Sequence, residues 1–377
     1  MWSKLMSTSL VLSCSLLATP LLAQASDRDD AANQPTIPQA TNTYHNTALT
    51  TNGSGGAFTD PNLVNPWGLS RSSGSPWWVS DNGTGLATLY LGTGAVLPLV
   101  VTIPAAKPGQ TGSPTGTIFN GTPGFVVGTG HAVFLFATED GTISGWNGGT
   151  NATIAVDESK TGASFKGLTM ATANLPQRPN QSLLYAADFT LGRVEVFDAS
   201  FHHLREVEEA FRDDNDDAAG SLSPFNVQNL GGNIYVSYAA LGSGNNQRNG
   251  EGLGAVRIFS PEGHLLTKLQ RGPWMNAPWG MAVAPSDFGP YSHSILVGNF
   301  GSGWISAFNS VTGQFQDYLR SDQGGLVNIP GLWALAPGNG NKAGSATAIF
   351  YSAGGTSETA GVLGTLTATQ NPQGNDQ

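Results

Sequence analysis

Four oxygen-bearing side chains stand beside short apolar runs, and together they could bind a metal ion. Asp188 and Asn299 each end an apolar run and precede phenylalanine, Glu139 follows another run, and Asn226 stands at the start of a further one. Calcium prefers carboxylate and amide oxygens and accepts them at flexible geometry from separate parts of a chain. The set therefore predicts a Ca²⁺ site, where a bound ion would polarise a carbonyl or phosphoryl oxygen.

The same residue types have a simpler explanation. Asp and Asn at hairpin ends bond to nearby backbone, so a turn role is the favoured interpretation of any one position. The ion site is an interpretation of the whole set. Other acids and amides are expected on the same face of the molecule: Asn65, Asp81, Asn82 and Asp140.

Other chemical signatures are absent from the sequence. It holds no Gly-x-Ser-x-Gly elbow, no Walker A loop and no Gly-x-Gly-x-x-Gly. Its six histidines lack metal-ligand spacing, and His202-His203 is expected in an exposed link. The acidic run at residues 213–217 has Ala218 and Pro224 where an EF-hand needs Gly and Glu, so it indicates a solvated loop, with loose calcium binding as the alternative.

Composition limits the class of protein. The chain has 377 residues, 50 of them glycine, with 11% charged residues and a net charge of −10. These values exclude a coiled coil, a charge-rich disordered chain and a basic nucleic-acid binder. A turn-rich, aromatic-rich chain of this kind is typical of an all-β fold.

The N-terminus is typical of a targeting segment. Residues 1–25 combine one lysine, an apolar stretch and the small-residue site Ala23-Gln24-Ala25, which predicts a signal peptide and export to the periplasm or the extracellular space. Cys14 is the only cysteine, and its place in this segment leaves open the alternative that the protein is a lipoprotein. Residues 26–42 and 367–377 are expected to be a flexible leader and tail. No later apolar run is long enough for a membrane span.

One hairpin pattern occurs six times, with copies roughly 50 to 60 residues apart. Equivalent turn positions are assigned in the six copies: Asp81, Glu139, Asp188, Tyr238, Asn299 and Ser352. Six units of four short strands predict a six-bladed β-propeller over residues 43–366. Residues 43–50 are expected to close the ring as the outermost strand of the last blade, which hides an open edge.

A third element precedes each hairpin and is expected to be the innermost strand. Its best copies are Pro66-Trp67-Gly68, Pro224-Phe225-Asn226 and Pro278-Trp279-Gly280, and looser copies are Lys166-Gly167-Leu168 and Gly331-Leu332-Trp333. Glycine suits strands that converge on an axis, where larger side chains would crowd. The Trp or Phe is expected to fill the wedge between blades.

Long motifs in a fixed order carry a resemblance to a known family. They include Val79-Ser80-Asp81-Asn82-Gly83, Tyr185-Ala186-Ala187-Asp188-Phe189 and Val297-Gly298-Asn299-Phe300-Gly301. The chain resembles a family of exported bacterial proteins described as conserved and uncharacterised, and these resemble NHL- and TolB-type six-bladed propellers. The resemblance implies the fold and export but no reaction. More distant propellers include calcium-dependent lactonases and phosphotriesterases, an analogy of fold only.

Two functions remain open at this point. The first is a non-catalytic exported module, expected to be a monomer, that presents loops to a protein, glycan, envelope or small-molecule partner. The second is a calcium-dependent hydrolase or lyase with its site at the axial mouth. The missing catalytic signatures favour the first, and the set of acids and amides favours the second.

Overall fold

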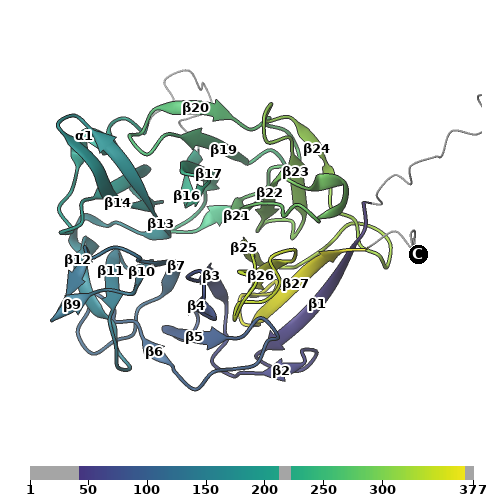
Figure 1. The fold of residues 1–377 in the computed structure, drawn as a ribbon, viewed down its shortest axis with the longest axis horizontal. Helices are drawn as coiled ribbons and strands as arrows, with labels where there is room; N and C mark the ends of the chain where they lie inside the picture. The colour runs from purple at the N-terminus through teal and green to yellow at the C-terminus, as the bar shows by residue number, and fades with distance from the viewer. Residues whose placement is uncertain (1–41, 212–221, 370–377) are drawn as a thin grey trace, which may run out of the picture. The chain divides into compact units, whose positions relative to one another are not determined.

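A computed structural model describes residues 42–211 and 222–369, which form six small β-sheets around a common axis (Figure 1). The chain divides into two compact units, Met1–Gln39 and Ala40–Gln377. The first unit, with the predicted signal peptide, lies outside the described residues, as does the acidic run. The predicted all-β six-bladed propeller is confirmed.

The first three blades follow chain order. Blade 1 contains β3 (Pro66–Ser70), β4 (Trp77–Asp81), β5 (Leu86–Tyr90) and β6 (Val101–Thr102). Blade 2 contains β7 (Pro114–Phe119), β10 (Phe134–Thr138), β11 (Thr142–Trp146) and β12 (Thr153–Asp157), and β8 (Val126–Val127) pairs with β9 (Gly130–His131) beside it. Blade 3 contains β13 (Phe165–Leu175), β14 (Arg178–Asp188) and β15 (Arg193–Phe197).

The other three blades complete the ring. Blade 4 contains β16 (Leu222–Leu230), β17 (Asn233–Leu241), β19 (Gly254–Phe259) and β20 (Leu265–Lys268), with β18 (Gln247–Arg248) paired to β17. Blade 5 contains β21 (Pro278–Val283), β22 (Ile295–Asn299), β23 (Ile305–Phe308) and β24 (Phe315–Tyr318). Blade 6 contains β25 (Leu332–Pro337), β26 (Ile349–Ala353), β27 (Val362–Ala368), β1 (Tyr44–Thr51) and β2 (Phe58–Thr59).

Three blades differ from the expected four strands. In blade 4 the short strand β18 pairs with β17 as a fifth strand. In the described residues, blade 3 has three strands, and the short helix α1 (Arg205–Glu208) follows its third strand. Blade 6 has five strands because β2 adds to β1 in parallel. The other helical elements of residues 42–211 and 222–369 are the 3₁₀ turns η1 (Ser159–Thr161) and η3 (Gly289–Tyr291). Within the described parts of the chain, no helix is both long and apolar enough to cross a membrane.

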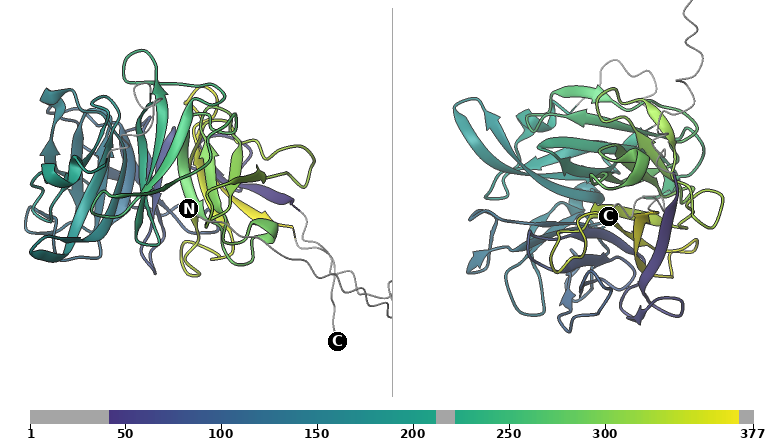
Figure 2. Two further views of the ribbon diagram at one scale, coloured as in Figure 1. Left: turned by 90° about the horizontal axis from the view of Figure 1, so that it is seen from above. Right: turned by 45° about the vertical axis from the view of Figure 1, so that its right-hand side comes forward.

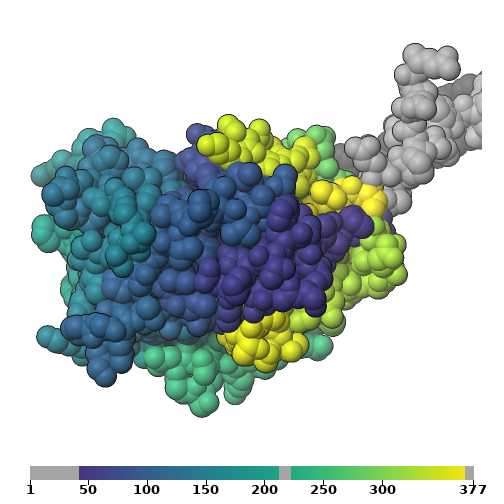
Figure 3. Space-filling model, turned by 90° about the horizontal axis from the view of Figure 1, so that it is seen from below, coloured from purple at the N-terminus to yellow at the C-terminus, as the bar shows by residue number. Residues whose placement is uncertain are grey.

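The ring closes as the sequence predicts. Strand β1 pairs antiparallel with β27, from Tyr44 opposite Ala368 to Thr51 opposite Val362. The purple start of the described chain therefore lies beside its yellow end in Figures 2 and 3. Strand β27 runs two residues past the expected end at Leu366, because β1 supplies partners as far as Ala368. The outer edge of the last blade, at β27, is thereby covered.

Apolar packing between blades supplies most of the core. Strands such as β4 and β22 are buried at every residue, since each blade packs against two neighbours. Six apolar clusters fill the six wedges, and a seventh lies on the axis. Between blades 6 and 1, for example, Trp77 and Phe350 lie with ring centroids 5.1 Å apart.

Glycine allows the inner strands to meet. A Cβ on Gly68 would lie 2.5 Å from the carbonyl oxygen of Thr115 in blade 2, and one on Gly116 would lie 2.3 Å from the backbone nitrogen of Leu168 in blade 3. Backbone cannot yield as a flexible side chain can. The predicted crowding at the axis is confirmed, and it fixes the positions of the residues that flank these glycines.

Candidate functional site

Strand register identifies equivalent positions in the six blades. In each blade the pairing between the inner strand and the second strand has a register shift, and the residue pair on its outer-loop side marks the equivalent position: Pro66 and Asp81, Pro114 and Thr138, Phe165 and Asp188, Pro224 and Tyr238, Pro278 and Asn299, Leu332 and Ala353. Glu139 and Ser352 are therefore offset by one residue from the equivalent positions that the sequence comparison assigned to them. A one-residue offset turns a side chain to the opposite face of a strand.

The residue that follows this pair in the inner strand, and the residue that follows it in the second strand, define two rings of side chains near the axis. The inner-strand ring is Trp67, Thr115, Lys166, Phe225, Trp279 and Trp333. The second-strand ring is Asn82, Glu139, Phe189, Ala239, Phe300 and Gly354. These rings gather residues that are far apart in the sequence.

Aromatic members of the two rings pack on one another at the axis. Trp67 of blade 1 stacks on Trp333 of blade 6 with ring centroids 3.6 Å apart, and Phe300 of blade 5 stacks on Trp333 at 4.1 Å. Trp279 meets Trp67 edge-on at 6.1 Å. The expectation that these rings fill wedges between blades is wrong. The inner strands start so close to the axis that their side chains meet across it.

Asn82, Glu139 and Lys166, ring members from blades 1 to 3, belong to one hydrogen-bonded network. Lys166 is only 1% exposed, and its Nζ pairs with Oε1 of Glu139, whose side chain is 26% exposed. Asn82 Nδ2 donates to Glu139 Oε2 at 2.9 Å. Asn65 Nδ2 donates to Asn82 Oδ1 at 3.4 Å and to Glu358 Oε2 at 3.1 Å. The network therefore links four blades around the axis.

The aromatic cluster holds this network in place. Lys166 Nζ lies 5.3 Å from the Trp67 ring centroid and 5.8 Å from that of Phe189, within reach of cation–π attraction. Trp333 Nε1 donates to Asn65 Oδ1 at 2.9 Å, and Trp279 Nε1 donates to the Lys166 carbonyl at 3.0 Å. Lys166 and Asn65 are thus each held by aromatic neighbours.

Two residues of the network adopt left-handed backbone conformations. Asn65 has φ 46° and Glu358 has φ 56°. Such conformations are costly for residues other than glycine and occur often where a site needs a side chain in a fixed place. Burial raises the pKa of Glu358, and the nearby charge of Glu139 adds to this rise. Strain and a perturbed carboxyl mark this end of the axis as the candidate functional site.

A cavity of about 490 Å³ opens beside the network. Its size falls in the range of roughly 300–1,000 Å³ usual for small-molecule sites. Its lining comes from loops of blades 4, 5 and 6: Asn246, Gln247, Asn249, Phe300, Gly301, Ser302, Gly303, Asn328, Pro330, Gly331, Gly355, Thr356 and Glu358. We call it the mouth cavity. Phe300 and Glu358 belong both to this lining and to the axial arrangement.

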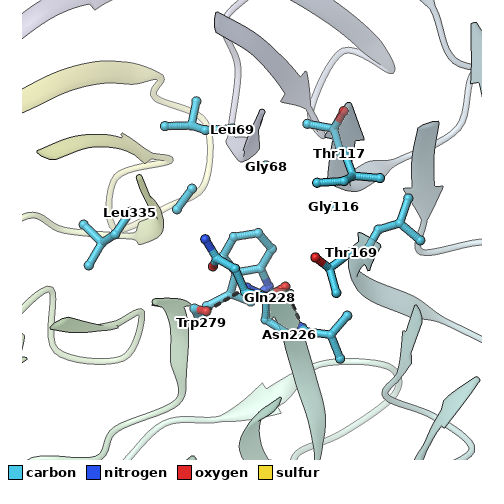
Figure 4. Close-up of a pocket in the computed structure, with 13 residues that line it drawn as sticks. Gly68, Leu69, Gly116, Thr117, Thr169, Asn226, Gln228, Trp279 and Leu335 are labelled. Carbon is cyan, nitrogen blue, oxygen red and sulfur yellow. Dashed lines mark hydrogen bonds between the residues drawn. The ribbon is translucent and has the colours of Figure 1, made fainter. Parts of the chain in front are cut away.

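A second cavity lies further along the inner strands, and it is much smaller. Figure 4 shows Gln228, Thr169 and Thr117 around it, with Trp279 and Asn226 at one side. Its volume is about 50 Å³, which holds a few water molecules at most. The glycine-packed axis is therefore narrow here, and the mouth cavity is the better place for a ligand.

The four predicted calcium ligands make separate hydrogen bonds. Asp188 Oδ1 accepts from the backbone N–H groups of Ser164 and Leu191, and burial raises its pKa. Asn299 Oδ1 accepts from the N–H of Asn276 at 2.8 Å, and Asn226 Nδ2 donates to the Trp279 carbonyl at 2.8 Å.

Hydrogen bonding does not bring these four residues together. Glu139 alone joins the axial network, while Asp188 and Asn299 serve their own blades as turn residues do. Among residues 42–211 and 222–369, no group of three or more His, Cys, Asp or Glu side chains is placed to hold a metal ion. Calcium binding stays a prediction.

Blade 3 holds a second polar cluster that the sequence did not reveal. His203 is 18% exposed, with Nδ1 2.7 Å from Glu208 Oε1, Nε2 2.8 Å from Glu158 Oε1 and Nε2 3.9 Å from buried Glu195. Burial alone would lower the pKa of His203, but hydrogen bonds to Glu208 and Glu158 raise it overall. The expectation of an exposed link is confirmed for His202 and is wrong for His203.

Two members of the axial site were missed in the sequence. Lys166 could have been found from the sequence, because it occupies the place of Trp or Phe in a repeated element. A lysine where other copies are aromatic and buried departs from the pattern. No sequence pattern indicated Glu358, since it lies in an ordinary turn sequence and is brought to Asn65 only by closure of the ring.

Comparisons with known proteins give relatives of undescribed activity. No family model matches the chain. The uncharacterised protein R648 of Acanthamoeba polyphaga mimivirus is 30% identical over 293 residues, which is 74% of this chain and 70% of that protein. The uncharacterised mimivirus protein L690 is 28% identical over 83% of each chain. These relatives are viral, so they do not support the bacterial origin that the motifs suggested.

Solved structures show more distant likeness. A streptogramin B lyase is 11% identical, with a TM-score of 0.46 over 86% of this chain and 97% of that one. The PQQ-bound aldose sugar dehydrogenase of Streptomyces coelicolor is 13% identical, with a TM-score of 0.45 over 87% and 99%. Neither likeness is close enough to support an argument. By its sequence, the chain belongs to the same family as the uncharacterised mimivirus protein R648.

Proposed function

We propose that the protein is a binding module that holds a polyhydroxylated ligand, of the saccharide class, in the mouth cavity. The observation that carries this proposal is the lining of the cavity. Apart from the carboxylate of Glu358, its polar side chains are amides and hydroxyls: Asn246, Gln247, Asn249, Asn328, Ser302 and Thr356. Amides both donate and accept hydrogen bonds, which suits sugar hydroxyls, since these also do both.

An aromatic surface completes the arrangement. Phe300 lines the cavity, is 9% exposed, and is fixed from behind by its stack on Trp333. A flat apolar ring of this kind can pack against the C–H face of a pyranose. Because the ring is already held, little side-chain freedom is lost on binding.

Charge argues against an anionic ligand. The residues that line the mouth cavity include no Lys, Arg or His, and Glu358 is their one ionisable side chain. A phosphate or polyanion would meet that carboxylate without a compensating base. We therefore propose a ligand without negative charge.

The proposed location rests on the sequence alone. The signal-peptide pattern of residues 1–25 supports export, and we propose that the protein binds its ligand in the periplasm or the extracellular space as a monomer. The calcium-dependent hydrolase or lyase remains the alternative that a calcium titration would test.

Titration calorimetry with neutral oligosaccharides tests the proposal. Asn249 and Asn328 line the cavity, and each substitution by Ala is expected to weaken binding about 3- to 10-fold, the loss of roughly one hydrogen bond. Asn151→Ala, at an exposed position in blade 2, is the matched control and should bind as the parent does. If no oligosaccharide binds more tightly than about 1 mM, the proposal is wrong.

A further inference from the structure

The mouth cavity has a single charged group, and its position defines a feature of the ligand. Resting on the saccharide-binding function above, we infer that the ligand carries a primary amine, as an amino sugar does, and that Glu358 binds its ammonium group. No other ionisable side chain lines the cavity. An ammonium would therefore find one specific partner there.

One oxygen of the Glu358 carboxylate is held and the other is open. Oε2 accepts a hydrogen bond from Asn65 Nδ2 at 3.1 Å. Oε1 accepts none from the described residues, although the side chain lines the cavity. An oriented carboxylate with one open oxygen suits a charge-assisted hydrogen bond to an ammonium, which is about twice as strong as a neutral one.

The charge of Glu358 is not neutralised by the nearest cation. Lys166 is paired with Glu139, and Glu139 receives a second hydrogen bond from Asn82. That pair is neutral as a unit, so Glu358 adds one negative charge at the cavity wall. Its only hydrogen-bond partner among the described residues is the uncharged amide of Asn65.

The surrounding structure holds Glu358 in a strained backbone conformation. Its φ of 56° and the φ of 46° at Asn65 are both in the left-handed region. Gly354 leaves room for Asn65, because a Cβ there would lie 2.1 Å from Asn65 Oδ1. Trp333 Nε1 then locks that same Oδ1 at 2.9 Å. The carboxylate is thus anchored, through one amide, to the aromatic cluster on the axis.

An ammonium also suits the remainder of the site. Phe300 lines the same cavity and would give the C–H groups beside the amine an apolar contact. The chain's net charge of −10 raises the local concentration of cationic ligands. Burial raises the pKa of Glu358, so a bound ammonium would shift the carboxyl back toward its ionised form.

Three tetrasaccharides with the same β-1,4 linkage distinguish the contribution of the amine to affinity from that of the rest of the sugar. They are cellotetraose, the glucosamine tetramer and its N-acetylated counterpart, and calorimetry near pH 6 would measure their affinities for the full chain. We expect the glucosamine tetramer to bind at least about tenfold more tightly than cellotetraose. In the Glu358→Gln variant this preference should fall to about one.

Glu251→Gln is the matched control. Glu251 is exposed in the loop that follows Asn249 and does not line the cavity, so the preference for the amine should stay within about twofold of the parent value. Lowering the pH to about 4 protonates Glu358, whose pKa is raised, and should reduce the preference in the parent but not in Glu358→Gln.

The outcomes distinguish the inference from the function on which it rests. If cellotetraose or the acetylated tetramer binds as tightly as the glucosamine tetramer, the inference is overturned and saccharide binding stands. If none of the three binds, the saccharide proposal fails and the inference fails with it. A preference that survives in Glu358→Gln assigns the amine to another group and also overturns the inference.

Discussion

Lys166 and Glu139 should respond very differently to removal, although they form one ion pair. Lys166 is 1% exposed and Glu139 is 26% exposed, so the group left behind faces a different environment in each case. We compare Glu139→Ala, which leaves a buried ammonium, with Lys166→Met, which leaves a carboxylate within reach of water. Methionine keeps most of the packing of the lysine stem against Trp67 and Phe189.

The magnitudes follow from burial. Removing one partner of a buried ion pair costs about 3–5 kcal/mol. In Glu139→Ala the ammonium keeps two aromatic faces, which favours the lower end, about 3 kcal/mol. In Lys166→Met the carboxylate keeps the hydrogen bond from Asn82 and can be hydrated, so about 1 kcal/mol is expected.

Urea unfolding monitored by tryptophan fluorescence measures the free energy of unfolding of each variant. Glu206→Ala breaks the surface pair with Arg178, whose side chains are 61% and 48% exposed, and should cost less than about 0.5 kcal/mol. Equal losses in Glu139→Ala and Lys166→Met would refute the reasoning from burial. A loss below about 1 kcal/mol in Glu139→Ala would show that the ammonium reaches water.

Two further predictions concern packing and pH. Gly280→Ala should cost about 2 kcal/mol or more in the same unfolding assay, because the added Cβ would lie 2.3 Å from a backbone oxygen of blade 6. The control Gly53→Ala should be neutral, because a Cβ at Gly53 meets nothing within 4 Å. Equal losses in the two variants would contradict the account of axial crowding. The pKa of His203 is raised in the folded state, so its contribution to stability is complete below about pH 6.5 and is lost as pH rises through the folded value. The parent should therefore exceed His203→Gln in stability at about pH 6 and lose that advantage by about pH 9, and a constant difference would contradict it.

The sequence predicted the fold well because the fold is repeated. Six hairpins with similar spacing leave few architectures, and residues 43–50 were the one strand available to close the last blade. The glycines beside Trp67 and Trp279 were interpreted correctly as marks of close approach. The direction of the tryptophan side chains was predicted wrongly, since the sequence shows periodicity but not how near to the axis each strand begins.

The site was harder to predict because it depends on single-residue register. Glu139 was aligned with Asp81 and Asp188, although the strand pairing matches those two to Thr138. That offset takes Glu139 out of its own hairpin and into the axial network. Glu358 reaches Asn65 only after the ring has closed. No local pattern records such a contact.

The departure from repeat symmetry is the strongest indication of where the function lies. An axial cluster that served packing alone would need only aromatic and small residues, as blades 4 to 6 provide with Phe225, Trp279 and Trp333. Blades 1 and 2 instead contribute an amide and a carboxylate from the second-strand ring, and blade 3 contributes a buried lysine from the inner-strand ring. Burying an ion pair gives little stability over an apolar pair of the same shape. Under the proposed function, the polar residues of the network serve to orient Glu358 beside the mouth cavity, through Asn82 and Asn65, and do not serve the stability of the ring.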